Sequence, residues 1–182
     1  MSERQPDPQR LDLRSLARTA VQIEGSLDPS ALPRFADSVL PGAGAESAVV
    51  WSARGELRAV KGGGPAQLWL HLQARTQVRL LCQRCLQPLD QNQAVHRSFL
   101  FVADEDEASR LDEEIDEDVL VLPRVFDVLQ LLEDELILAL PIVPRHEACP
   151  VPLFEPFSVD EEAVAPHPFA ALAALRKPPR PN

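Results

Sequence analysis

Two cysteines three positions apart, Cys82 and Cys85, are the residues of this 182-residue chain with the clearest capacity for chemistry. They stand in the segment LLCQRCLQPL, between two stretches that alternate like β-strands. On a tight turn both thiols can face one ion, because the intervening residues curl back beneath them. His146 and Cys149 follow after a helical pattern, and Cys149 is the last of only three cysteines. Three sulfurs and one imidazole suit tetrahedral zinc, so these four residues are the candidate metal ligands.

Other uses of the cysteines are left open by the sequence. The Cys82–Cys85 spacing is typical of zinc ligands, but the His146–Cys149 spacing is less diagnostic, so a degenerate site without metal is an alternative. A small zinc- or redox-active cysteine protein unrelated to RNA is another. A redox pair usually begins a helix in an alternating α/β pattern, whereas this pair lies in a hairpin. Hydrolytic zinc needs a base, and only Glu147 neighbours the candidate ligands.

Composition indicates one domain of ordinary size in a reducing compartment. The chain is 45% hydrophobic, which is enough for a core. An odd number of cysteines excludes a complete disulfide framework. No apolar run approaches the roughly 18 residues that a membrane span needs, and the first ten residues lack the apolar core of a secretory signal. We therefore expect a cytoplasmic protein without a membrane partner.

The net charge of −10 is concentrated in one segment. Residues 103–118 hold ten acidic residues and one arginine, a net of −9, whereas residues 63–102 carry a net of +3. Like charges repel one another, so the acidic segment is predicted to be a solvated loop. A second interpretation is a mobile acidic arm that engages a basic protein or competes with nucleic acid.

Two periodicities predict an α+β fold with an antiparallel sheet. Residues 67–81 show a long alternation of apolar and polar residues, and 89–102 form the return strand of a long central hairpin that carries the cysteine turn. A helical stripe from Asp127 to Leu140 is predicted to pack on this sheet. The apolar residues of the long strand are Leu68, Leu70, Leu72, Ala74, Val78 and Leu80, and the acidic residues expected on the solvent face of the helix are Glu133, Asp134 and Glu135.

Shorter signals organise the rest of the chain. Asp28 and Pro29 are expected to open a helix that runs to Leu40. Residues 49–59 resemble a hairpin that turns at Arg54-Gly55, and residues 119–122 a short strand. The expected organisation is an extended segment over 1–24, one domain over 25–149, and a Pro-rich tail over 150–182. A short amphipathic helix is expected at 168–177, within this tail.

Three segments in this order resemble one protein family. They are LLCQRCLQPL, DVLQLLEDELILALPIVPRHEAC and PFAALAALRK, with an acidic stretch between the first two. Together they are similar to the YceD family of bacterial large ribosomal RNA subunit accumulation proteins, over roughly residues 25–177. The resemblance implies a role in synthesis, processing or stability of large-subunit (23S-type) ribosomal RNA, and so in ribosome biogenesis. Some family members have a cysteine-rich C-terminal region that resembles a zinc site together with the first two cysteines, where this chain has only His146 and Cys149.

The expected mode of action is therefore non-catalytic. We expect the partner to be either the large-subunit ribosomal RNA precursor or a basic ribosomal protein, and we do not expect DNA. Basic side chains on a sheet can neutralise phosphates, and the candidates for this are Arg75, Arg79, Arg84 and His71. An isoelectric point near 4.8 argues against strong non-specific nucleic-acid binding. The oligomeric state is not determined by the sequence.

Overall fold

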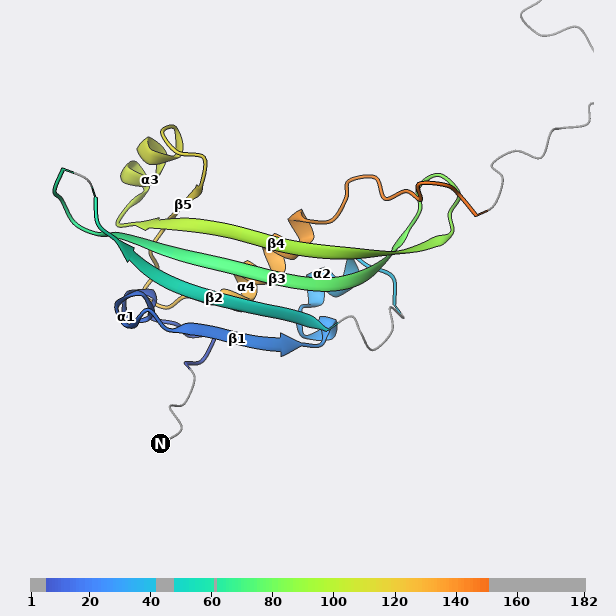
Figure 1. The fold of residues 1–182 in the computed structure, drawn as a ribbon, viewed down its shortest axis with the longest axis horizontal. Coiled ribbons are helices and arrows are strands. Elements are labelled where there is room, and N and C mark those ends of the chain that lie inside the picture. Colours follow the sequence, from blue (N-terminus) through green and yellow to red (C-terminus); the bar gives the residue numbers. More distant parts are fainter. Residues whose placement is uncertain (1–5, 42–47, 61, 151–182) are drawn as a thin grey trace, which may run out of the picture. The chain divides into compact units, whose positions relative to one another are not determined.

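One five-stranded sheet with helices on both faces forms the fold (Figure 1). The computed structural model describes residues 6–41, 48–60 and 62–150. The strands lie in chain order, and all neighbours are antiparallel except β4 and β5, which are parallel. The predicted α+β fold is confirmed, with β5 as an unexpected parallel edge. The elements are α1 (Leu13–Thr19), β1 (Gln22–Leu27), the 3₁₀ turn η1 (Pro29–Ala31), α2 (Pro33–Asp37), β2 (Val49–Arg58), β3 (Gln67–Leu81), β4 (Pro88–Val102), α3 (Glu105–Asp112), β5 (Asp118–Val121) and α4 (Val128–Leu138).

Strands β3 and β4 form the predicted central hairpin. Their register runs from Leu68 opposite Phe101 to Leu81 opposite Pro88. Successive side chains of a strand point to opposite faces, and β3 buries every second residue from Leu68 to Leu80. The alternation therefore identified both the strand and its core face, and it placed the cysteine turn at one end of the hairpin.

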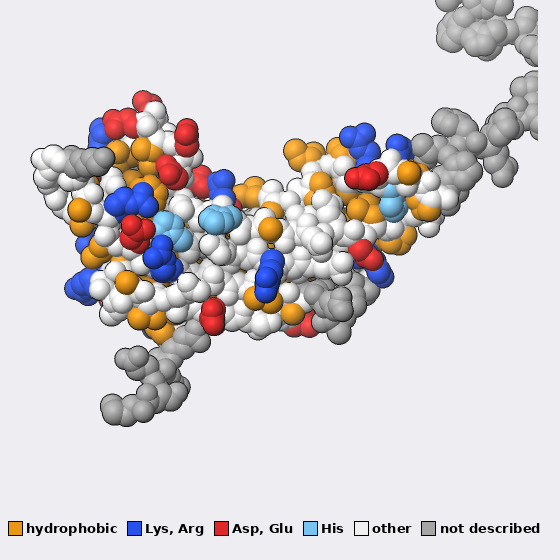
Figure 2. All heavy atoms as spheres, in the orientation of Figure 1, with side chains coloured by type: hydrophobic (Ala, Val, Ile, Leu, Met, Phe, Trp, Pro, Cys, Tyr) orange, Lys and Arg blue, Asp and Glu red, His pale blue; other side chains and the backbone are white. Residues whose placement is uncertain are grey.

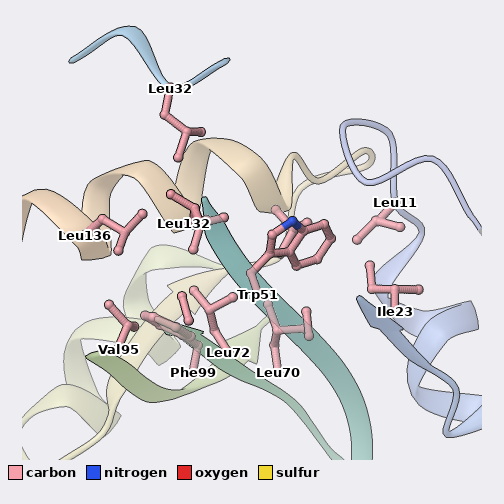
Figure 3. Close-up of a cluster of buried hydrophobic side chains, with 14 of the residues drawn as sticks. Leu11, Ile23, Leu32, Trp51, Leu70, Leu72, Val95, Phe99, Leu132 and Leu136 are labelled. Atoms are coloured by element: carbon pink, nitrogen blue, oxygen red, sulfur yellow. The ribbon is translucent and has the colours of Figure 1, made fainter. Parts of the chain in front are cut away.

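The main core lies on the face that α1, α2 and α4 cover (Figure 3). Leu70, Leu72 and Phe99 from the sheet meet Leu132 and Leu136 from α4, and all five are almost completely buried. Burying a large apolar side chain contributes about 1.5–3 kcal/mol. These contacts therefore anchor α4 on the hairpin, and the chain leaves α4 toward the cysteine turn.

Helix α4 agrees with the predicted helix. Asp127 is its N-cap, and the carboxylate accepts hydrogen bonds from the backbone N–H groups of Leu129 and Gln130, at 2.9 and 3.1 Å. Residues four positions apart share one face of a helix. The fully buried stripe consists of Val128, Leu132 and Leu136.

The acidic segment, predicted as a loop over 103–118, is helical from Glu105 to Asp112, so that prediction is wrong for this part of it. Asp104 caps α3 by accepting from the backbone N–H of Glu107, while the Glu107 side chain accepts from the N–H of Ala103. Ala108 is buried, and Leu111 and Ile115 pack beside it, at the spacing of one helical face. Charge repulsion is thus offset by capping and by an apolar face, which the high acidic content obscured.

Helix α3 covers one end of the sheet face opposite the main core. Its apolar side packs on a second cluster that includes Trp69, Leu100 and Val102. These residues alternate along β3 and β4 with the residues of the main core. The middle of this second face is not covered by any helix in the part of the chain that the structure describes.

The N-terminal segment is not extended over residues 1–24, contrary to the prediction. Asp12 caps α1 by accepting from the backbone N–H of Ser15 at 3.1 Å. Leu13 and Leu16 are buried against the sheet, and β1 begins at Gln22. The irregular apolar spacing concealed this helix, because its seven residues show barely two repeats of the 3.6-residue pattern.

The predicted hairpin turn at Arg54-Gly55 is also wrong, because β2 continues straight through it. A Cβ atom on Gly55 would lie 2.7 Å from the backbone nitrogen of Ala17. The glycine thus allows α1 to approach the strand closely, which is the other common reason for a glycine in a strand.

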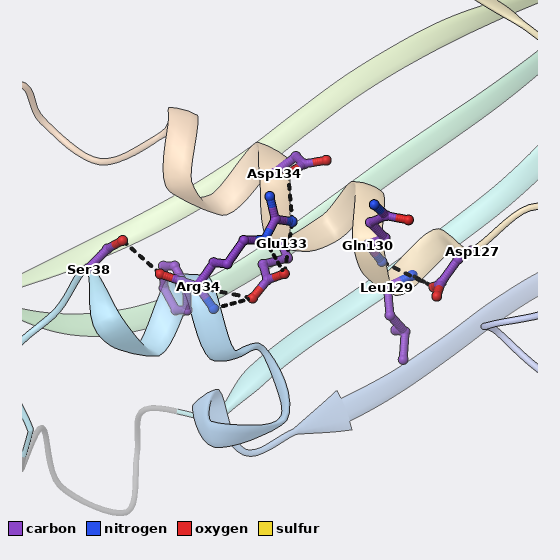
Figure 4. Close-up of polar contacts among 8 residues, drawn as sticks. Arg34, Ser38, Asp127, Leu129, Gln130, Glu133 and Asp134 are labelled. Atoms are coloured by element: carbon purple, nitrogen blue, oxygen red, sulfur yellow. Dashed lines mark hydrogen bonds and ion pairs between the residues drawn. The ribbon is translucent and has the colours of Figure 1, made fainter.

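The predicted helix from Asp28 to Leu40 is divided in two. Asp28 caps η1 as expected, but Pro33 opens a separate helix, α2. Leu32 offers no side-chain cap, and α2 is instead capped by Glu133 of α4 (Figure 4). The Glu133 carboxylate accepts from the backbone N–H groups of Arg34 and Phe35, at 2.7 and 3.2 Å.

Three acidic residues of α4 were predicted to face solvent, and this prediction is wrong for two of them. Glu133 is 7% exposed and pairs with the Arg34 guanidinium at 2.9 Å. Glu135 is 8% exposed and lies 3.3 Å from the Arg97 guanidinium. Both carboxylates are buried with cationic partners, because α2 and β4 supply them from distant parts of the chain.

The tail helix expected at residues 168–177 lies outside the described residues. The described residues up to Cys149 belong to one compact unit. Within the described residues, no helix is both long enough and apolar enough to span a membrane.

Candidate metal centre

The four candidate metal ligands lie together at the end of the central hairpin that carries the cysteine turn, which we call the knuckle. Their ligand atoms are all within 4.8 Å of one another; the residues are Cys82, Cys85, His146 and Cys149. Zinc–sulfur bonds of about 2.3 Å at tetrahedral angles place sulfurs about 3.8 Å apart. The four ligand atoms are therefore close enough to bind one tetrahedral ion after only a small adjustment of the backbone.

The knuckle itself, residues 82–87, is a hydrogen-bonded turn. The N–H of Leu86 donates to the carbonyl of Cys82 at 2.9 Å, and the N–H of Cys82 donates to that of Gln87 at 3.0 Å. Leu86 takes a left-handed conformation with φ of +56°. This conformation turns the chain back after Cys85, so that both knuckle thiols face the same point.

The second ligand pair arrives on the segment that follows α4. Pro141 and Pro144 cannot continue the helix, and the Pro144 carbonyl accepts from the N–H of Gln83 at 2.8 Å. This bond brings the segment against the knuckle. His146 and Cys149 thus join Cys82 and Cys85 only because α4 packs along the hairpin.

The imidazole of His146 is held in an orientation that suits a ligand. Its Nε2 lies 3.2 Å from the carbonyl of Pro88, to which it can only donate. This leaves the unprotonated Nδ1 facing the Cys85 sulfur at 3.4 Å. A histidine ligand in metal sites usually donates its other N–H to an outer partner in this manner.

Neighbouring groups shift the pKa values of the Cys82 and Cys85 thiols in opposite directions. Burial alone would raise the pKa of Cys82, but the backbone N–H groups of His146, Cys85 and Arg84 donate to its sulfur and lower the pKa to about 5. The pKa of Cys85 is raised by burial and by the neighbouring sulfurs of Cys149 and Cys82. Ligand thiols must be thiolates, so a metal that binds here releases protons.

Three of the four candidate RNA-binding side chains are engaged within the protein. Arg79 donates to both oxygens of Asp90, at 2.7 and 3.0 Å. His71 lies 2.7 Å from Glu56 and 2.8 Å from Ser98. The Arg84 guanidinium donates to the Cys149 sulfur and to the carbonyls of His146 and Glu147, although the residue remains exposed.

Arg75 lies on the uncovered middle of the sheet, beside a shallow hollow of about 750 Å³. Figure 2 shows this side of the molecule: uncharged atoms dominate the sheet, while acidic side chains gather over α3. Ser52, Gln73 and His96 line the same hollow. The structure therefore separates the predicted basic residues and does not join them in one patch.

Sequence reasoning missed the contact between Arg84 and the second ligand pair. Arg84 lies inside the Cys-x-x-Cys segment, and its side chain meets Cys149 at 3.0 Å. No local pattern predicts a contact across 65 residues. The only available signal was the position of a permanently charged guanidinium between two thiols.

Comparison with known proteins identifies the family. A family model described as "Large ribosomal RNA subunit accumulation protein YceD" matches residues 70–176. A protein of Haemophilus influenzae with the same description is 40% identical over 105 residues. The aligned region covers 55% of this chain and 60% of that relative, so the chain spans about three fifths of the relative's length. No solved structure matches. Because the family model covers more than half of the chain and includes the knuckle, α3 and α4, the chain belongs to the YceD family of large ribosomal RNA subunit accumulation proteins.

Proposed function

We propose that this protein is a non-catalytic cytoplasmic factor that supports the accumulation of large-subunit ribosomal RNA by contacting a basic ribosomal protein during ribosome assembly. Membership of the YceD family carries the proposal, because the family description and that of the relative both state this accumulation role. The choice of partner depends on the surface charges of the described residues.

The acidic surface on and after α3 supports a basic protein partner. All nine acidic residues from Asp104 to Glu117 are exposed. Within the described residues, Glu114 is the only one of these nine in an ion pair, with Arg110 at 2.8 Å. Because α3 is packed on Trp69 and Leu100, these charges are presented on a folded surface. Complementary charge of this kind steers and aligns a basic partner.

Direct RNA binding has weaker support. Arg79, His71 and Arg84 are occupied by internal partners. Of the four candidates this leaves Arg75, which lines the hollow on the uncovered face of the sheet. A single arginine neutralises few phosphates, whereas non-specific RNA affinity grows with the number neutralised.

We also propose that zinc occupies the cluster of Cys82, Cys85, His146 and Cys149 as a structural ion. Four protein ligands fill a tetrahedral shell, which leaves no open position for a substrate or an activated water. The ion would supply a crosslink between the knuckle and the segment after α4. Metal analysis of protein purified under reducing conditions should give one zinc per chain, and the Cys149→Ser variant should give much less.

The experiment that tests the partner is crosslinking in cells with the full tagged chain, read for both protein and RNA. The informative variant replaces Glu105, Asp106, Glu113 and Glu117 with their amides. It spares Asp104 and Glu107, which cap α3. The matched control makes the same change at Glu155, Asp160, Glu161 and Glu162, which removes the same charge from the tail.

We expect the α3 variant to lose about tenfold in partner affinity at low salt, since exposed charge pairs each contribute about 0.2–1 kcal/mol. The loss should shrink as salt rises. Equal loss in the tail control would show that only net charge matters. Recovery of ribosomal RNA precursors without a basic protein would favour the RNA alternative.

A further inference from the structure

We propose that Arg84 is a positioning residue of the metal centre: it holds the second ligand pair against the knuckle and balances the charge of the bound ion. This assignment rests on the proposed zinc site. It replaces the role in phosphate binding that the sequence suggested for Arg84.

The contacts of Arg84 all reach the second ligand pair. Its Nε donates to the sulfur of Cys149 at 3.0 Å. Its Nη2 donates to the backbone carbonyls of His146 and Glu147, at 2.9 and 3.3 Å. One guanidinium thus contacts the ligand atom of Cys149 and two consecutive backbone carbonyls at the start of the segment that joins the two ligands.

The charge of the centre requires a cation at this place. Three thiolates and a neutral imidazole around a divalent ion leave one net negative charge. Cys82 is buried, and the other three ligands are partly buried, so water compensates this charge only in part. The guanidinium in contact with Cys149 brings the total to zero.

The geometry also requires a residue that orders the second pair. The segment after α4 has no regular structure around His146 and Cys149. Within the described residues it is held at the knuckle by the Gln83–Pro144 backbone bond, the His146–Pro88 bond and the bonds from Arg84. Without Arg84, fewer contacts hold this segment at the knuckle, so the metal has to supply more of its ordering, and the entropy of that ordering lowers the affinity.

Lysine cannot reproduce this arrangement. The guanidinium is a planar fork whose Nε and Nη2 point in fixed directions, toward the sulfur and toward the carbonyls. An ammonium group carries the same charge on a single atom. The charge and the fork can therefore be separated by comparing Arg84→Lys with Arg84→Gln.

The experiment is titration of the full, reduced, metal-free chain with Co²⁺, followed by competition with Zn²⁺. Removing an outer partner of a metal ligand typically costs 10–100-fold in affinity. We expect Arg84→Gln to weaken Co²⁺ and Zn²⁺ binding by this factor and to shift the sulfur-to-cobalt charge-transfer band. Arg84→Lys should fall between Arg84→Gln and the wild type.

The matched control is Arg75→Gln, which removes the same charge from the uncovered sheet face. It should leave the metal affinity unchanged. Far-ultraviolet circular dichroism of each metal-free variant establishes that the sheet is intact, and Arg84→Lys keeps the test available if Arg84→Gln does not fold.

Two results would overturn the proposal in distinguishable ways. Unchanged affinity and an unchanged cobalt spectrum in Arg84→Gln would refute the role of Arg84 and leave the zinc site standing. A wild-type chain that binds neither Co²⁺ nor Zn²⁺ would refute the zinc site, and the role of Arg84 with it. If Arg84→Gln lowers RNA crosslinking but not metal affinity, phosphate binding is the better role.

Discussion

The two ends of the central hairpin are stabilised by different forces. At the end that carries α3, Trp69 and Leu100 pack under Ala108, so apolar burial holds the elements together. At the knuckle end, the segment after α4 is held by hydrogen bonds and by ligand side chains that converge on one point. Two apolar residues there are exposed, Leu86 at 65% and Ile142 at 99%, although Leu80 just before the knuckle is buried. One end therefore folds by its own packing, whereas the other depends on polar contacts and on the proposed ion.

The largest effect that distinguishes the two ends should come from metal removal. A ligand present at 1,000 times its dissociation constant stabilises by about 4.1 kcal/mol. We expect a chelator to lower the free energy of unfolding by about this amount and to speed hydrogen exchange over residues 82–88 and 141–149. Exchange in α3 should be unchanged.

The control for metal removal is Cys149→Ser. It should reproduce the effect of the chelator, and the chelator should then add little. If the chelator leaves both stability and exchange unchanged, the knuckle end is self-sufficient and the contrast between the ends is wrong.

The reciprocal test is Trp69→Ala at the α3 end. Trp69 is 5% exposed, and its ring also carries the Arg58 guanidinium at 4.5 Å. Loss of a buried tryptophan costs about 3–5 kcal/mol, and we expect about 3 kcal/mol because α3 lies at the edge of the fold. Denaturant unfolding measures the loss, and cobalt titration should show unchanged metal affinity. Coupled losses would mean that the two ends fold as one unit.

Glu133 lies on α4 between the two ends, so its removal should weaken the whole fold. Glu133→Ala leaves the buried N–H of Phe35 without its acceptor, which costs about 1–3 kcal/mol. Glu133→Gln keeps an acceptor and loses only the charge, so it should cost less. Denaturant unfolding should give about 2 kcal/mol for the alanine variant, with no preference for either end in hydrogen exchange.

The pH dependence of this contribution has a defined sign. Burial tends to raise the pKa of Glu133, but Arg34 and the N–H groups of Phe35 and Arg34 outweigh it and lower the pKa. The stabilisation is therefore complete above the unfolded-state pKa and is lost as pH falls through the lower folded-state value. Unfolding measured from pH 7 down to 3 should show a weaker acid dependence in Glu133→Gln than in the wild type. An identical dependence would contradict the pairing.

The smallest effect should come from Leu86 in the knuckle. A left-handed conformation costs a residue with a Cβ atom about 1–2 kcal/mol, and glycine avoids that cost but loses more entropy on folding. We expect Leu86→Gly to stabilise the metal-bound form by about 0.5 kcal/mol, as measured by thermal unfolding. A destabilisation above about 1 kcal/mol would show that the exposed side chain makes a contact that matters.

Patterns confined to one element were readable from the sequence. The alternation over 67–81 predicted β3 with its boundaries, and the stripe after Asp127 predicted α4 and its cap. The type and spacing of Cys82 and Cys85 identified the knuckle. Such patterns are local because strand and helix periodicities are set by backbone geometry alone.

Contacts between elements that are distant in the sequence could be identified only from the tertiary structure. Gly55 was interpreted as a turn because nothing in its own segment reveals the backbone of α1 above it. Glu133 was placed in solvent because its partners lie on α2, almost a hundred residues earlier. The contact of Arg84 with Cys149 was missed for the same reason, since Cys149 and the carbonyls before it reach the guanidinium only when α4 packs along the hairpin. Residue type and spacing thus decide which chemistry is available, and long-range packing decides which groups use it.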